Sequence, residues 1–190
     1  MKQSLGAKPM ATVAPVWLVG SYDAQGKANL AAVAWGGTCC SEPPALTISL
    51  RKSRHSYDSI LERKAFTVNI PSESQLVAAD YTGLVSGRDV DKFAAAGLTA
   101  VASDVVDAPY VAEFPLVIEC RLLQVIELGI HTQFIGEIVD TKAEEGVLDA
   151  GGLLDAALVR PVVYTPASRT YYALGAVIGK GFDIGRGLMK

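Results

Sequence analysis

Basic and hydroxyl side chains cluster in LRKSRHS, residues 50–56. The segment follows an alternating strand pattern and precedes a helical one, with Ser53 or Ser56 as the expected cap residue. A helix start offers unpaired backbone N–H groups and the positive end of a dipole, which favour a phosphate group. Arg51, His55 and Ser56 would add charge-assisted hydrogen bonds to such an anion. The alternative interpretation is a solvated basic helix cap that binds nothing.

A second unusual stretch, AWGGTCCSEPP, spans residues 34–44. Its glycines and small side chains could bring the backbone close to a flat ligand, or could form an ordinary tight bend that the two prolines complete. Cys39 and Cys40 are neighbours and cannot easily form a disulfide with each other. They could relay electrons as thiols if one were activated, or serve as small polarisable side chains. The latter interpretation is the simpler one.

A histidine lies on the polar face of an alternating stretch at 130–139. His131 shares this face with Gln133 and Glu137, whereas Thr132 and Phe134 point to the other side. His131 is therefore expected on a polar or ligand-facing surface. The alternative is a surface histidine without a role.

Several common chemistries are not encoded. No G-x-G-x-x-G follows a strand, and GAVIGKG at 175–181 lacks the spacing and the hydroxyl residue of a phosphate loop. No G-x-S-x-G is present, and neither of the two histidines stands in a metal-binding motif. We expect neither a hydrolase triad nor a metal site.

The elements that must position these residues are mostly strands. A capping-box pattern at Ser72 to Gln75 opens a helix that Gly83 should stop, and a short helix is expected at 91–96 before Gly97. Many uneven strands with a few inserted helices favour an antiparallel barrel over a doubly wound sheet. The expected strands are 12–20, 27–38, 45–50, 65–71, 111–128, 130–139, 161–165 and 170–175.

Composition sets further bounds. The 190 residues fit one domain, 1–190, and 50% are hydrophobic against 19% charged, which makes a dimer a reasonable expectation. A net charge of −3 without basic blocks argues against nucleic acid as a partner. No long apolar run or leader pattern indicates a membrane protein or an exported one, so a soluble, cytoplasmic protein is expected. The odd count of three cysteines is typical of a reducing compartment.

Taken together, these motifs resemble the flavin reductase-like, FMN-binding split-barrel family, and within it the flavoredoxin branch. The resemblance covers nearly the whole chain. It is carried by PVWLVGSYDAQGKANLAAVAWGGTCCSEPPALTISLRKSRHSY, then FTVNIP, GLVSGRDVDKF and GIHTQFIGEIV, in the family's order. It implies a mainly β fold, a Greek-key split β-barrel with a few inserted helices, which forms a homodimer with one FMN per subunit near the subunit interface.

The resemblance also implies site residues. The segment from Ala34 to Ser41 would run along the isoalloxazine ring, and the turn from Arg51 to Ser56 would bind the phosphate. Asn69, Ser86 and Lys92 fall on positions that approach the flavin in relatives. The cofactor-binding residues so expected are Trp35, Gly36, Gly37, Thr38, Cys39, Cys40, Ser41, Arg51, Ser53, His55, Ser56, Asn69, Ser86 and Lys92.

His131 would lie on the open side of the flavin, where it positions the reductant and does not itself transfer a proton. The expected function is an FMN-containing oxidoreductase or electron-transfer flavoprotein whose electron donor is NAD(P)H or a redox protein. The main alternative is a non-catalytic barrel that binds or senses a flavin. Pyridoxamine-phosphate-oxidase-like chemistry would need a second phosphate site, which the sequence does not show.

Overall fold

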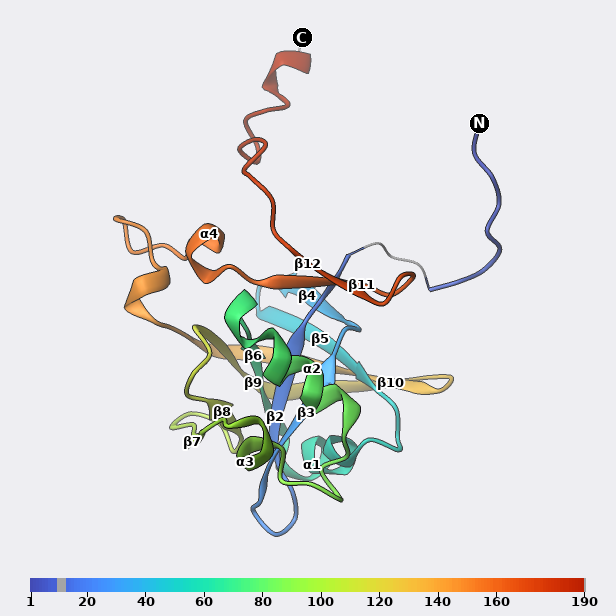
Figure 1. The fold of residues 1–190 in the computed structure, drawn as a ribbon, viewed down its shortest axis with the longest axis vertical. Coiled ribbons are helices and arrows are strands. Elements are labelled where there is room, and N and C mark those ends of the chain that lie inside the picture. The colour runs from blue at the N-terminus through green and yellow to red at the C-terminus, as the bar shows by residue number, and fades with distance from the viewer. Residues whose placement is uncertain (10–12, 190) are drawn as a thin grey trace.

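The computed structural model describes residues 1–9 and 13–189, so residue 12 of the first expected strand lies outside the described residues. A seven-stranded antiparallel sheet forms the body (Figure 1). Its strand order is β3-β2-β6-β9-β10-β5-β4. The strands are β2 (Trp17–Tyr22), β3 (Ala28–Val33), β4 (Gly36–Ser41), β5 (Pro44–Leu50), β6 (Ala65–Ile70), β9 (Leu116–Leu128) and β10 (His131–Ala143).

The two edge strands of this sheet, β3 and β4, are consecutive in the chain. Only Ala34 and Trp35 separate them, so the sheet must curl until its edges lie close together. The predicted single strand at 27–38 is therefore wrong: the chain crosses from one edge to the other at Trp35, whose carbonyl accepts a hydrogen bond of 2.8 Å from the Ser49 N–H. The result is the expected mainly β split barrel.

Smaller elements flank the barrel. The capping box at Ser72 and Gln75 is confirmed, and Gly97 ends a short helix in the left-handed region, as predicted. The remaining strands are β1 (Ala14–Pro15), β7 (Ala100–Ala102), β8 (Pro109–Val111), β11 (Val162–Thr165) and β12 (Thr170–Ala173). The helices are α1 (His55–Arg63), η1 (Glu73–Gln75), α2 (Leu76–Leu84), α3 (Lys92–Ala96), η2 (Glu145–Val147), α4 (Ala156–Val159) and η3 (Arg186–Leu188).

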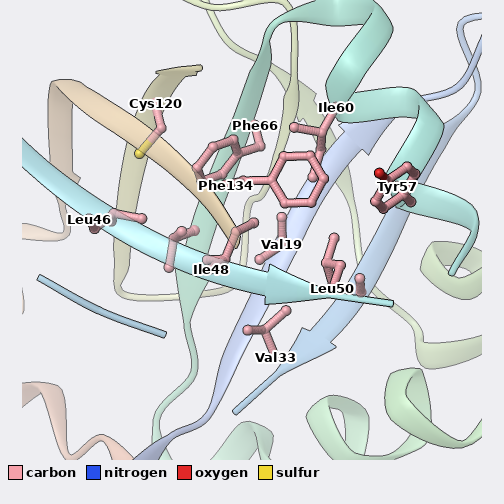
Figure 2. Packing of buried hydrophobic residues seen from close by; sticks show 12 residues of the cluster. Val19, Val33, Leu46, Ile48, Leu50, Tyr57, Ile60, Phe66, Cys120 and Phe134 are labelled. Carbon is pink, nitrogen blue, oxygen red and sulfur yellow. The ribbon is translucent and has the colours of Figure 1, made fainter. Parts of the chain in front are cut away.

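The barrel interior is filled by alternate residues of its strands. In β5, Leu46, Ile48 and Leu50 are buried, which confirms the alternation seen in the sequence. Figure 2 shows these side chains packed around Phe66 and Phe134. A second apolar cluster, with Leu18, Leu30 and Phe93 among its members, lies outside the barrel. This packing fixes β5 and the start of α1, the two elements that precede and follow the basic turn.

Among residues 1–9 and 13–189, no helix is long and apolar enough to cross a membrane.

Candidate functional site

Helix α1 begins directly after the basic turn that follows β5. The expected cap was Ser53 or Ser56, but the N-cap residue is Arg54, and no side chain caps the helix. The Tyr57 N–H donates to the Arg54 carbonyl at 3.0 Å, but the N–H groups of His55 and Ser56 have no side-chain capping acceptor among the described residues, and the helix dipole adds partial positive charge there. The helix start can accept an anion.

A cavity of about 140 Å³ opens at this helix start, between α1, β3 and the chain that follows α2. We call it the α1 pocket. It brings together five residues predicted from the sequence and adds Arg54, Asn29 and Gly87. The five predicted residues are Ser53, His55, Ser56, Ser86 and Lys92.

Lys92 is the most deeply placed charge of the α1 pocket, with only 6% of the residue exposed. Its ammonium donates to the carbonyls of Leu30 (2.8 Å) and Thr82 (2.6 Å). Burial, assisted by the nearby charge of Arg54, lowers its pKa from 10.5 to about 8. Three N–H donors and two carbonyl partners leave one donor free, and among the described residues no carboxylate forms an ion pair with it. An anion in the pocket would supply the missing partner.

A hydrogen bond organises the hydroxyl of Ser56, which is buried. The side-chain amide of Asn29 donates to Ser56 Oγ at 2.8 Å, so the hydroxyl keeps its own hydrogen for another acceptor. Gly87 packs so closely here that an added Cβ would lie 2.0 Å from Asn29 Oδ1 and 2.9 Å from the His55 ring. Sequence reasoning missed Asn29, because an Asn in a strand carries no local signal of its partner 27 residues away.

Two further contacts fix the walls of the α1 pocket. His55 Nε2 lies 3.6 Å from the carboxylate of Asp23, which orients the ring. Arg88 donates to the carbonyl of Ser53 at 2.7 Å and ties the loop after α2 to the basic turn. The donor groups are therefore arranged before any ligand enters.

Beside Trp35, the predicted ring-binding segment forms the edge strand β4, whose one partner among the described strands is β5. We call Gly36–Ser41 with Trp35 and His131 the β4 surface. A Cβ at Gly36 would lie 2.6 Å from the Trp17 ring, whereas a Cβ at Gly37 would meet no atom within 4 Å. Gly36 is needed for packing, and Gly37 leaves open space above the strand. The four residues from Thr38 to Ser41 are exposed.

The turn after β9 brings His131 to the β4 surface. Its ring lies edge-on to the Trp35 ring, with centroids 6.4 Å apart. Burial, and then the charge of Arg51, lower the pKa of His131, so the imidazole is neutral at pH 7. Arg51 lies near His131 and does not line the α1 pocket. The structure thus separates Arg51 from Ser53, His55 and Ser56, with which it was grouped.

Residues 10–173 match the model of the flavin reductase-like domain. This match covers most of the chain. The chain belongs to the flavin reductase-like family.

Two solved structures are similar to this chain in sequence and in fold. Flavoredoxin of Desulfovibrio vulgaris (Miyazaki F) is 51% identical, with a TM-score of 0.93 over 97% of this chain and 100% of that one. Flavoredoxin from Methanosarcina acetivorans is 30% identical, with a TM-score of 0.93 and full coverage of both chains. These matches establish a split-barrel, flavin-binding fold of the flavoredoxin type.

Matches to curated relatives cover a smaller part of this chain. A protein of Aeropyrum pernix is 31% identical over 147 residues, 76% of this chain. The chain spans only 55% of that relative's length and 64% of one from Archaeoglobus fulgidus. The high molecular weight rubredoxin of Moorella thermoacetica is 31% identical over 102 residues, which are 53% of this chain and 43% of that protein.

Asn69, a site residue expected from the family resemblance, lies apart from the α1 pocket and from the β4 surface. It is fully buried on β6 and does not line the α1 pocket. Its amide donates to the Leu18 carbonyl (2.9 Å) and to Thr67 Oγ1 (2.9 Å), and its oxygen accepts from the Val111 N–H (2.8 Å). These bonds connect β2, β6 and β8, so the side chain serves the scaffold.

Proposed function

We propose that this chain binds FMN and acts as an oxidoreductase or electron-transfer flavoprotein, with the phosphate in the α1 pocket and the ring along the β4 surface. The observation that carries the proposal is the ammonium of Lys92. It is buried beside an uncapped helix start, and no carboxylate in the described part of the chain pairs with its remaining donor. The glycines of β4 lie at the edge of the barrel, where a flat group has room.

The donors of the α1 pocket fit a phosphate monoester. A phosphate that leaves water must regain its hydrogen bonds, and bonds to charged donors contribute about 1.5–3 kcal/mol each. Lys92, the Ser56 hydroxyl and the first-turn N–H groups of α1 supply such bonds together. The pocket therefore distinguishes FMN from riboflavin, which lacks the phosphate.

The β4 surface suits the ring and its reductant. A bound flavin supplies hydride and single-electron transfer chemistry. On the protein's side, Gly37 gives the ring space, and Trp35, which is 39% exposed, can cover part of it. His131 is a neutral hydrogen-bonding group and orients the electron donor. Arg51, being close to His131, adds positive charge for an anionic donor such as NAD(P)H.

The electron donor is NAD(P)H or a redox protein. The likeness to two flavoredoxins supports an electron carrier, and the likeness to a high molecular weight rubredoxin supports a redox-protein partner. We further propose a homodimer in which the β4 surface lies near the subunit interface. The exposed apolar residues Leu123, Leu128 and Ile130 of the β9–β10 hairpin support such an interface.

Reconstitution followed by rapid kinetics tests the function. The protein is loaded with FMN, dialysed, and its visible spectrum recorded before it is mixed anaerobically with NADH, NADPH or a chemically reduced rubredoxin. Fast bleaching by a pyridine nucleotide indicates a reductase, and bleaching by rubredoxin alone indicates a carrier. A stable yellow protein that neither donor reduces would indicate a flavin-binding or flavin-sensing module. A colourless protein after dialysis would refute the proposal.

A further inference from the structure

The C-terminal segment after β12 leaves the body of the molecule (Figure 1). We call residues 174–189 the arm. Its backbone hydrogen bonds join residues within the arm, such as Ile184 N–H to the Lys180 carbonyl (3.1 Å). Its apolar side chains are largely exposed: Val177 86%, Ile178 95%, Ile184 72%, Leu188 90%, and Phe182 fully.

Such exposure is costly in water. Burial of a large apolar side chain is favourable, and contiguous exposed apolar residues mark interaction sites. The arm lies beyond residue 173, where the match to the family domain ends. The barrel core and the α1 pocket are complete without it. The arm is therefore suited to contact another molecule.

The charge of the arm indicates which molecule it contacts. The arm and Lys190 carry Lys180, Arg186 and Lys190 against Asp183, a formal charge of +2. Residues 1–173 hold the other 14 basic and 19 acidic side chains, a formal charge of −5. A basic, apolar arm is thus complementary to the acidic body of a second copy of this chain.

A cavity that could serve as a docking site lies at the base of the arm. A cavity of about 340 Å³ is formed between β1, the end of β3, α2 and the β11–β12 hairpin, and we call it the β12 pocket. Its walls are mainly apolar, and its charged lining residues are Arg169 and Asp80, the latter of which accepts a hydrogen bond of 2.6 Å from Tyr171. In a two-fold dimer whose axis passes near β12, each arm crosses directly to this region of its partner. The walls include Val16, Val33, Ala79, Leu84, Tyr164 and Tyr171.

We propose that the arm of each copy docks in the β12 pocket of a second copy, with Phe182 and Ile178 as its apolar anchors. The inference rests on the homodimer of the proposed function. The β12 pocket shares Ala32 with the α1 pocket and reaches Ala34, next to Trp35. A docked arm would therefore cover the side of the site that one copy leaves open.

Photocrosslinking directly tests where the arm docks. A chain with p-benzoylphenylalanine in place of Phe182 is mixed with an excess of ¹⁵N-labelled wild-type chain and irradiated. We expect crosslinks from the unlabelled arm to labelled peptides that contain residues 76–84 or 164–171. Crosslinks confined to unlabelled peptides at every mixing ratio, crosslinks to other peptides, or none would each overturn the proposal. The control carries the same group at Val105, an exposed residue of the β7–β8 connection, and should give no such product.

A double substitution tests the anchors. Ile178→Ser with Phe182→Ser should raise the dimer dissociation constant on the order of 100-fold in sedimentation equilibrium, whereas Val105→Ser should leave it unchanged. An unchanged constant in the double variant would overturn the proposal. FMN content is measured separately on the wild-type chain. Arm crosslinks from the p-benzoylphenylalanine chain, together with a wild-type chain that retains no FMN, contradict the proposed cofactor alone; a wild-type chain that retains FMN without such crosslinks from the substituted chain contradicts the arm alone.

Discussion

The α1 pocket and the β4 surface differ in how much of their chemistry is arranged in advance. In the α1 pocket, Lys92 and Ser56 are buried, and each is held by hydrogen bonds to the scaffold. The β4 surface is an edge strand with exposed side chains from Thr38 to Ser41, and its open side faces outward. A preorganised, dry pocket is suited to affinity, and an open strand is suited to exchange with a second reactant. A substitution in the α1 pocket should therefore reduce affinity, and one in the β4 surface should reduce exchange with the second reactant, each without the other effect.

Lys92→Met should have the largest effect, which is a difference between the affinities for FMN and for riboflavin. Loss of the ammonium removes a charge-assisted bond to the phosphate, so FMN affinity should fall on the order of 100-fold. Riboflavin has no phosphate, so its affinity should change less than threefold. Fluorescence titration with both flavins measures the selectivity.

The matched control is Lys27→Met, since Lys27 is half exposed and lies 3.8 Å from Asp91 at the surface. It should leave both affinities unchanged. Equal losses of FMN and riboflavin in Lys92→Met would show that the substitution damages the scaffold, through the unpaired carbonyls of Leu30 and Thr82, and not the phosphate contact.

The pH dependence of FMN binding should follow the same lysine. Burial lowers the pKa of Lys92 from 10.5 to about 8, so the ligand-free protein loses this charge as the pH rises through 8. FMN affinity should then fall by up to about tenfold per pH unit above 8. The stability of the ligand-free protein should instead rise between pH 8 and about 10.5, because the unfolded chain holds the proton more tightly there.

Isothermal titration calorimetry from pH 7 to 10 and urea unfolding over the same range measure the two slopes. Both slopes should be absent in Lys92→Met, and riboflavin serves as the reference for ionisation of the flavin ring itself. An FMN affinity that stays constant from pH 7 to 10 would rule out Lys92 as the phosphate partner.

His131→Ala should affect the other region. Removal of the imidazole leaves the α1 pocket intact, so FMN content should stay within twofold of wild type. Reduction by NADH or NADPH should slow about tenfold, since one positioning contact is lost. Stopped-flow absorbance measures the rate.

Gln133→Ala is the control for His131→Ala, because Gln133 lies on the same face of β10 and the pocket residues do not include it. Its reduction rate should match wild type. A His131→Ala protein that is reduced as fast as wild type would leave His131 without a role, and one that has lost its FMN would place the histidine in the binding site.

The same contrast explains what the sequence could predict. The alternation of β5 and the capping box at Ser72 depend on neighbouring residues, so local patterns were sufficient. Ser53, His55 and Ser56 of the α1 pocket could be selected from the sequence because a helix start is also a local signal, whereas the actual cap residue, Arg54, was not predicted. The fold and much of the pocket were therefore predictable.

Other features depend on contacts that are distant in sequence. The break at Trp35 was missed because the stretch rich in Ala, Val, Leu and Trp runs on through it, and no local residue pattern marks the change of sheet edge. Arg51 was grouped with the phosphate turn by alternation, but the curl of the barrel brings it near His131. Asn69 was assigned through resemblance, yet its amide bonds to Leu18 and Val111 from other strands. No local pattern reports such partners.

The smallest effect is expected for Cys39→Ala combined with Cys40→Ala. Although Cys39 is exposed overall, partial desolvation of its thiol, and then the proximity of Cys40, raise the pKa of that thiol, so little thiolate forms at neutral pH. Cys40 Sγ donates to the Glu42 carbonyl at 3.3 Å, a weak contact at the surface. We therefore expect the β4 surface to contact the flavin through its backbone and not to use its thiols. Electron-transfer rates should stay within twofold, and the wild-type thiol count should be the same before and after turnover; a large loss of rate in the variant with intact FMN would instead establish a thiol relay.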